Sequence, residues 1–183
     1  MRAFHTKRRI AYDGTQLASH WAYRCFNIQG DSIVSFVGSC RVDIGRLVDL
    51  ADAKAGAYIA SPLMLHFICE HFGIDLENCV LRQRMLSAIC GEILRERGKK
   101  VARRGDDLYY EERKLSVSIA APTPVSCMMH FALNIETKGT PVPAAGLAEM
   151  KVDPAWLAKK LSAAYVLEIE SAQAATTKVR GIP

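Results

Sequence analysis

Side chains that could do chemistry are concentrated between residues 103 and 134. This segment opens with two arginines, a glycine and two adjacent carboxylates, and its charged members are Arg103, Arg104, Asp106 and Asp107. Guanidinium groups bind phosphate oxygens in pairs, and carboxylates hold divalent cations. The segment therefore has the residue types of a phosphate or metal site, although a solvated turn before a hairpin would have the same composition.

A second group of polar residues alternates along the strand that follows. Lys114, Ser116 and Ser118 occupy every second position, with apolar residues between them, so they share one face of a predicted strand. His130 and Asn134 share a face of the next predicted strand, and we expect that face to be the one carrying Lys114. Small hydrogen-bonding groups of this kind suit the floor of a ligand site, and a wet sheet face is the alternative.

The elements that must position these residues predict an α+β fold. Asp75 and Gly98 have the residue types that begin and end a helix, and Asp153 followed by Pro154 is a second helix start. Residues 63–72 could be strand or helix, and the glycine that follows favours strand. In chain order we expect strands at 32–42 and 63–72, a helix at 76–97, a hairpin at 108–120, a strand at 125–136 and a helix from 154 to about 172.

This order is not a βαβ alternation. It predicts one domain over residues 1–183, in which helices cover a mainly antiparallel or mixed sheet. Half of the residues are apolar and 23% are charged, which excludes a disordered chain. The net charge of +5 is too small to argue for nucleic acid by itself.

The distribution of cysteine indicates the compartment. Six cysteines are scattered among apolar neighbours, which predicts reduced and mostly buried thiols rather than a disulfide framework. The first ten residues are basic and do not lead into an apolar run, so we expect no secretory signal. No stretch is long and apolar enough for a membrane span. We therefore expect a cytoplasmic protein without a membrane partner, and we leave a homodimer open.

Three other kinds of site are weaker alternatives. His66 with Cys69 and Cys127 with His130 are zinc-ligand types, but residues three apart on a strand point to opposite faces. Gly30-Asp-Ser resembles a serine hydrolase block that lacks a suitable late histidine. The basic residues at 95–104, together with two tyrosines at 109–110, leave RNA or DNA as a less favoured partner.

The same residues resemble those of biotin and lipoate protein ligases. Arg103-Arg-Gly-Asp-Asp-Leu, followed by Lys114-Leu-Ser-Val-Ser, is similar to a motif in which an Asn-Asp pair precedes a Lys-(Ile/Leu)-x-Gly strand. His130-Phe-Ala-Leu-Asn-Ile is similar to the His-Gly-Leu-Ala-Leu-Asn-Val strand of lipoate octanoyltransferases and to the Gly-Ile-Gly-Ile-Asn-Val strand of biotin ligases. The resemblance covers about residues 63–170 and implies the ligase catalytic core.

Over its whole length the chain is more closely similar to an uncharacterised family, the domain-of-unknown-function family numbered three hundred and sixty-six. The segments that carry this likeness are YDGTQL, GDSIVSF, MLHFICEHF, RQRMLSAI, RRGDDLYYEERKLSVSIA and HFALNI. We know of no established activity for that family, so the likeness informs the fold more than the function.

The ligase resemblance implies roles for single residues. Lys114 falls on the catalytic or substrate-carbonyl lysine, and Asp106 and Asp107 fall on the pair that arranges metal and phosphate. Arg103 falls where biotin ligases have a lysine. We therefore expect Lys114 and Asp107 to be catalytic. We expect the substrate to be contacted by Arg103, Arg104, Asp106, Ser116, Ser118, His130 and Asn134.

The chain also departs from the ligase pattern. The ligases close a Gly/Arg-rich loop over the acyl-adenylate, whereas residues 40–60 hold only two glycines and two arginines. ATP and Mg²⁺, which the resemblance implies, are therefore left open. Val117 stands where the motif has glycine, and Cys127 precedes Asn134 instead of following it. The function we expect is binding of a small carboxylate or heterocycle, with acyl or adenylyl transfer or a diverged chemistry. A non-catalytic binding module is the alternative.

Overall fold

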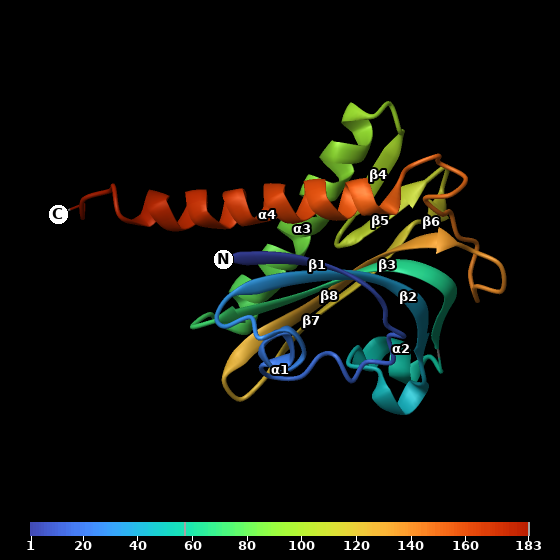
Figure 1. Cartoon of the computed structure of the whole chain (residues 1–183), viewed down its shortest axis with the longest axis horizontal. Coiled ribbons are helices and arrows are strands. Elements are labelled where there is room, and N and C mark those ends of the chain that lie inside the picture. Colours follow the sequence, from blue (N-terminus) through green and yellow to red (C-terminus); the bar gives the residue numbers. More distant parts are fainter. Residues whose placement is uncertain (57, 183) are drawn as a thin grey trace.

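Strands and helices follow one another along the chain in the order drawn in Figure 1. The structure is a computed structural model that describes residues 1–56 and 58–182. Its elements are β1 (Arg2–Arg9), α1 (Trp21–Phe26), β2 (Ser32–Val42), the 3₁₀ helix η1 (Ile44–Arg46), α2 (Leu50–Lys54), β3 (Ile59–Phe72), α3 (Leu76–Glu96), β4 (Val101–Arg104), β5 (Asp107–Tyr110), β6 (Arg113–Lys114), β7 (Ser116–Pro122), β8 (Ser126–Glu136) and α4 (Pro154–Thr176).

Within residues 1–56 and 58–182, the strands form two sheets. The larger sheet has the order β1-β2-β3-β8-β7, in which β1 is parallel to β2 and the other neighbours are antiparallel. The smaller sheet is the antiparallel set β4-β5-β6. The mixed sheet covered by helices confirms the predicted α+β class.

The larger sheet is buried on both faces. On one face, side chains such as Leu65 and Phe67 belong to the core that includes α3 and α4. On the other, Met64 and Ile68 belong to a second core with Tyr12 and residues of α1. Figure 1 shows α3 and α4 above the sheet and the short helices α1 and α2 below it. We call the side covered by α1 and α2 the lower face.

The sequence signals for the helices are present in the structure. The Asp75 carboxylate accepts a hydrogen bond of 2.8 Å from the backbone N–H of Asn78, and Asp153 caps α4 in the same way. Residues 63–72 form part of β3, so the strand interpretation is confirmed. The last helix runs to Thr176, somewhat beyond the predicted end.

The predicted hairpin is present, but its return strand is divided. β5 and β6 are joined by a turn at Glu111 and Glu112, both of which have positive φ. At Leu115 the chain leaves the small sheet, and β7 then pairs with β8 in the large one. β4, which pairs with β5, was not predicted.

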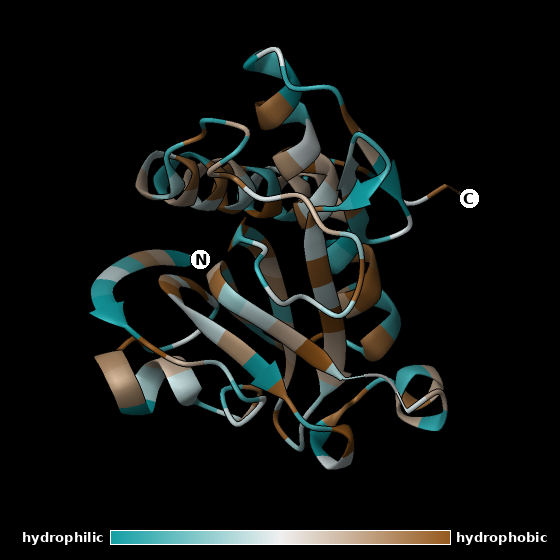
Figure 2. Ribbon diagram, turned by 90° about the vertical axis from the view of Figure 1, so that its right-hand side faces the viewer, coloured by the Kyte–Doolittle hydropathy of each residue, from teal (hydrophilic) through white to brown (hydrophobic). Residues whose placement is uncertain are grey.

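The edge strand β1 is mostly exposed, and the cysteines are mostly buried, as their apolar neighbours predict. Figure 2 shows β1, at one edge of the sheet, as a largely hydrophilic ribbon, and charged edges discourage pairing with other chains. All six cysteines are free, and only Cys25 is exposed. Within the described residues, no helix combines the length and the apolar character needed to cross a bilayer.

Candidate functional site

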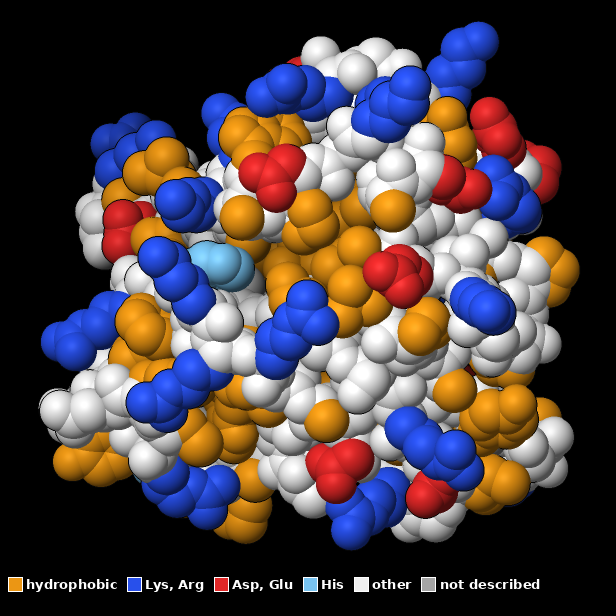
Figure 3. Space-filling view, turned by 45° about the vertical axis from the view of Figure 1, so that its right-hand side comes forward, with side chains coloured by type: hydrophobic (Ala, Val, Ile, Leu, Met, Phe, Trp, Pro, Cys, Tyr) orange, Lys and Arg blue, Asp and Glu red, His pale blue; other side chains and the backbone are white. Residues whose placement is uncertain are grey.

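A cleft lies on the lower face of the large sheet, over β7, β8 and the start of β3. It consists of two adjoining cavities, of about 160 and about 50 Å³, which share Asp52, Ile59 and Val117 in their walls. Lys114 and Asn134 line the larger cavity, and His130 lines the smaller one. Figure 3 shows the molecule turned by 45° from Figure 1. Hydrophobic side chains lie at the centre of this view, with basic and acidic side chains around them.

The ammonium group of Lys114 is paired with the carboxylate of Asp107. The small sheet brings the two side chains together. Lys114 lies opposite Tyr109, and Asp107 is two residues from Tyr109, on the same face of β5. Lys114 Nζ lies 2.8 Å from Asp107 Oδ2, and the two side chains are 33% and 21% exposed. The pair is thus partly shielded but open to exchange with a ligand.

Burial and charge act on this pair in opposite directions. Burial lowers the pKa of Lys114, but the hydrogen bond and the charge of Asp107 outweigh burial, so the pKa is raised overall. Burial raises the pKa of the Asp107 carboxyl, and Lys114 only partly offsets this. The negative charge of Asp52 raises the pKa of both groups. Lys114 therefore stays cationic, and Asp107 takes up a proton more readily than an ordinary aspartate.

The backbone of Lys114 is held by two other parts of the chain. Its N–H donates to the carbonyl of Pro143, and its carbonyl accepts from the N–H of Ala145. The carboxamide of Asn134 donates to the same carbonyl, at 3.3 Å. Asn134 therefore both lines the cleft and positions Lys114.

His130 lies at the bottom of the cleft in an aromatic stack. The ring of Tyr12 covers it at a centroid separation of 3.7 Å and an angle of 14°. Its Nε2 lies 3.0 Å from Nδ1 of His66, whose Nε2 lies 3.2 Å from the carbonyl oxygen of Gly38. Burial lowers the pKa of His66 to about 4 and that of His130 well below its ordinary value. Both imidazoles are therefore neutral near pH 7.

The expected grouping of Ser116 and Ser118 with His130 and Asn134 is wrong. In the pairing of β7 with β8, Ser116 lies opposite Leu133 and Ser118 opposite Phe131, which places both serines on the face covered by α3 and α4. The alternation from Lys114 does not continue past Leu115, because the chain changes sheets there.

The hydroxyl groups of both serines have partners within the protein. The Ser116 hydroxyl accepts from the N–H of Leu108. Ser118 reaches the wall of the smaller cavity, but its hydroxyl donates to Asp106 and accepts from Gln83 of α3. Asp106 therefore ties the hairpin to α3 and does not join Asp107 at Lys114. Within the described residues, no three His, Cys, Asp or Glu side chains are grouped as metal ligands.

The two arginines of the motif lie outside the cleft. Arg103 is exposed and donates to the carbonyl of Gly105. Arg104 pairs with Glu112, and its guanidinium lies 4.8 Å from the ring centroid of Tyr109. The expectation that these arginines contact the substrate of this cleft is therefore not supported by their position.

The alternative sites do not assemble either. His66 and His130 meet on the lower face, whereas Cys69 and Cys127 belong to the opposite core, so the zinc arrangement fails for the predicted reason. The hydroxyl of Ser32 is buried, and it has no hydrogen-bond partner among the described residues, which excludes a serine–histidine pair.

Several residues of the cleft were missed by sequence reasoning. Tyr12, Asp52 and Met64 line it, and so do residues 140–142, which the sequence marks only as a Pro/Gly-containing turn. The one signal was the ligase resemblance, which directs attention to residues 40–60 as the segment to search for a closing loop. Part of this segment, including Arg46 and Asp49, does lie over the cleft.

The fold is that of the biotin and lipoate protein ligase catalytic core. A biotin protein ligase from Aquifex aeolicus, solved in complex with biotin and ATP, superposes with a TM-score of 0.61 at 15% identity, over 92% of this chain and 70% of that one. Ta0514 from T. acidophilum, a candidate lipoate protein ligase, superposes with a TM-score of 0.55 at 18% identity, over 87% and 81% of the two chains.

The chain belongs to the family described as Domain of unknown function (DUF366), which matches residues 1–180. A protein of unknown function from Pyrococcus horikoshi has a TM-score of 0.95 and 40% identity, over 100% of this chain and 99% of that one. The uncharacterised protein MJ0805 of Methanocaldococcus jannaschii is 40% identical over 144 residues, which are 76% of this chain. The match spans 65% of that relative's length.

Proposed function

We propose that the protein binds a small carboxylate with an apolar body in the cleft, and either transfers the acyl group of that acid or transfers an adenylyl group to its carboxylate. The observation that carries the proposal is Lys114, a cation in the lining of a cavity whose walls also include Met64, Val117 and Val142. An ammonium group recognises a carboxylate, and the apolar walls recognise the rest of the molecule.

In this proposal Lys114 exchanges partners when the ligand binds. The ligand carboxylate replaces Asp107 at the ammonium group, and Asp107, with its raised pKa, takes a proton more easily once it has lost that partner. Lys114 then offsets the negative charge that develops on a carbonyl or phosphate oxygen during transfer. Asn134 holds the lysine backbone in place.

The Aquifex aeolicus ligase, solved with biotin and ATP, supports adenylyl transfer as one version of the chemistry. In that version a carboxylate oxygen attacks the α-phosphorus of ATP, the new P–O bond forms, and pyrophosphate leaves. Arg46 lines the cleft but is paired with Asp13 at 2.7 Å. ATP use would therefore require Arg46 to change partner, or another group to meet the phosphates.

Calorimetric titration with biotin, lipoic acid and octanoate tests the binding step. We expect one of these acids to bind the wild-type protein, and Lys114→Met to weaken that binding by about tenfold or more through the loss of the charge. Asp107→Asn should strengthen it, because a competing carboxylate is removed. Lys138→Met, an exposed change outside the cleft, is the matched control.

Two results would refute this proposal. One is a flat titration for all three acids. The other is equal binding by wild type and Lys114→Met. Pyrophosphate exchange into ATP, measured with the acid that binds, then decides between adenylyl transfer and binding without turnover.

A further inference from the structure

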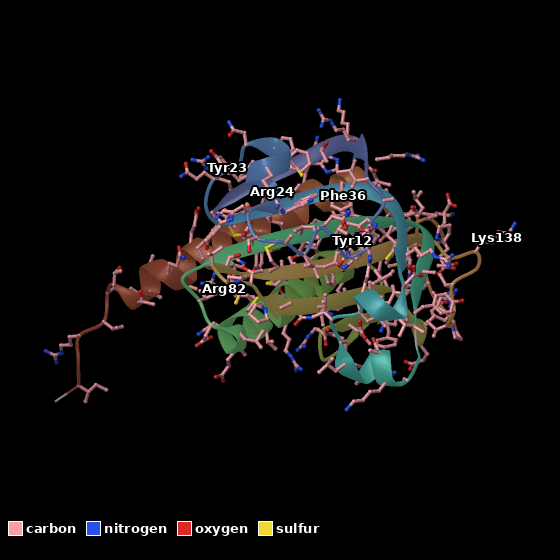
Figure 4. The ribbon with its side chains drawn as sticks, turned by 90° about the horizontal axis from the view of Figure 1, so that it is seen from below. Tyr12, Tyr23, Arg24, Phe36, Arg82 and Lys138 are labelled. Carbon is pink, nitrogen blue, oxygen red and sulfur yellow. The ribbon has the colours of Figure 1, made fainter. Side chains whose placement is uncertain are left out.

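A second cavity, of about 360 Å³, lies beneath α1, toward the other end of β3. It is lined by His20, Tyr23, Glu70, Phe72 and residues 28–30, and none of these lines the cleft. Figure 4 shows Tyr23 and Arg24 on α1, to one side of Tyr12, which covers the cleft. The two sites are therefore separate places on the lower face.

The carboxylate in this cavity is deeply buried. Glu70 is 2% exposed, and its Oε1 accepts hydrogen bonds from the N–H of His20 at 2.7 Å and the hydroxyl of Ser126 at 2.8 Å. Among residues 1–56 and 58–182, no lysine, arginine or amino terminus forms an ion pair with Glu70. Because buried carboxylates are normally paired with a cation, Glu70 is suited to bind a positively charged ligand.

A hydroxyl group on the strand beside Glu70 lacks a hydrogen-bond partner among the described residues. Ser32 lies directly opposite Glu70 in the pairing of β2 with β3, so the two side chains share the lower face. The Ser32 hydroxyl is fully buried and has no hydrogen-bond partner within the described part of the chain. Unsatisfied buried hydroxyls are uncommon in folded proteins.

Aromatic rings line the same cavity as the carboxylate. The imidazole of His20 packs on Phe72 at a centroid separation of 5.5 Å, and Tyr23 is half exposed at the entrance. His20 has a left-handed backbone, with φ 60° and ψ 25°, and strained backbone of this kind is frequent at binding sites. A carboxylate with aromatic neighbours recognises organic ammonium groups, through an ion pair and through cation–π attraction.

We propose that this cavity binds the primary ammonium group of a small alkylamine. Glu70 is the counter-ion, and the rings of Tyr23 and Phe72 contact the alkyl part. A metal ion is the poorer occupant, because no group of three His, Cys, Asp or Glu side chains occurs among the described residues. The ligand proposed for this site is a cation, whereas the ligand proposed for the cleft is an anion.

Titration of the full-length protein with n-butylammonium chloride tests the inference, with n-butanol as the neutral analogue. We expect saturable binding of the amine, with a dissociation constant of about 10 mM or below, and much weaker binding of the alcohol. Glu70→Gln keeps an oxygen acceptor for His20 and Ser126 but removes the charge, and should weaken amine binding by about tenfold. Glu96→Gln, an exposed change of the same type, should leave binding unchanged.

Tyr23→Ala provides a second variant, should Glu70→Gln fail to fold. Tyr23 is half exposed, so its removal leaves the core intact, and we expect amine binding to weaken by about threefold. The inference is overturned if the wild type shows no saturable amine binding up to about 50 mM. The inference is also overturned if n-butanol binds with the same affinity as the amine. A folded Glu70→Gln protein that binds the amine with wild-type affinity would overturn it too.

Discussion

The carboxamide Nδ2 of Asn134 donates a 3.3 Å hydrogen bond to the backbone carbonyl oxygen of Lys114, from β8 to the end of β6. This bond joins the large sheet to the small one at the residue that carries the cation of the cleft. The two sheets therefore meet at the candidate site, and the position of Lys114 depends on both.

Removal of the Asn134 carboxamide should loosen this junction. We expect Asn134→Ala to lower the free energy of unfolding by about 1 kcal/mol, the usual effect of one lost hydrogen bond. Urea denaturation measures the change. Gln173→Ala, on the exposed side of α4, should stay within about 0.5 kcal/mol of wild type. An Asn134→Ala protein as stable as wild type would show that the bond contributes nothing.

The segment that supports Lys114 depends on a glycine. A Cβ atom at Gly146 would lie 2.5 Å from the carbonyl oxygen of Ile135, so Gly146→Ala must displace backbone near Ala145. We expect a loss of about 2–4 kcal/mol of unfolding free energy. Gly45→Ala is the matched control, because nothing lies within 4 Å of a Cβ there. Equal melting temperatures for the two variants would contradict this prediction.

The buried histidine pair should make stability depend on pH. In the unfolded chain both imidazoles titrate near pH 6.5, whereas burial lowers the folded-state pKa of His66 to about 4 and that of His130 well below 6.5. As the pH falls below about 6.5, the unfolded state binds protons that the folded state does not, so stability is lost.

Urea denaturation at several pH values between about 7.5 and 4.5 measures this loss. His66→Gln removes one member of this histidine pair, so its stability should fall less steeply with decreasing pH, by about one proton. The comparison is between the slopes of unfolding free energy against pH, so a constant difference in stability between the two proteins does not affect it. Parallel pH profiles for the two proteins would mean that His66 is not the group responsible.

The turn that leads to Lys114 is strained. Glu111 and Glu112 have φ values of 49° and 62°, which are left-handed. In two-residue hairpin turns with this conformation, Asn and Gly are the favoured residues. The double change Glu111→Asn and Glu112→Gly relieves this backbone strain and should raise the unfolding free energy by about 1 kcal/mol. The exposed ion pairs that the change removes contribute little, so their loss does not cancel the gain. Thermal melting checks this, and a lower melting temperature would show that those ion pairs matter more than the strain.

Much of the fold could be predicted from local signals. The capping residues Asp75 and Asp153 mark both long helices, and the apolar alternation marks β8. The shorter elements were missed because their stability comes from contacts with distant residues. α1 is six residues long, and β4 exists only by pairing with β5.

The sequence by itself determined the class of fold and the main elements, because caps and alternation act over a few residues. Only the tertiary structure decided which side chains share the cleft. Ser116 and Ser118 lie on the face covered by α3 and α4, although Ser118 reaches the cleft wall, because pairing with β8, and not alternation from Lys114, sets their face. Tyr12 reached it because the chain after β1 folds back over the sheet, and Met64 because β3 pairs with β8, contacts that no local pattern records.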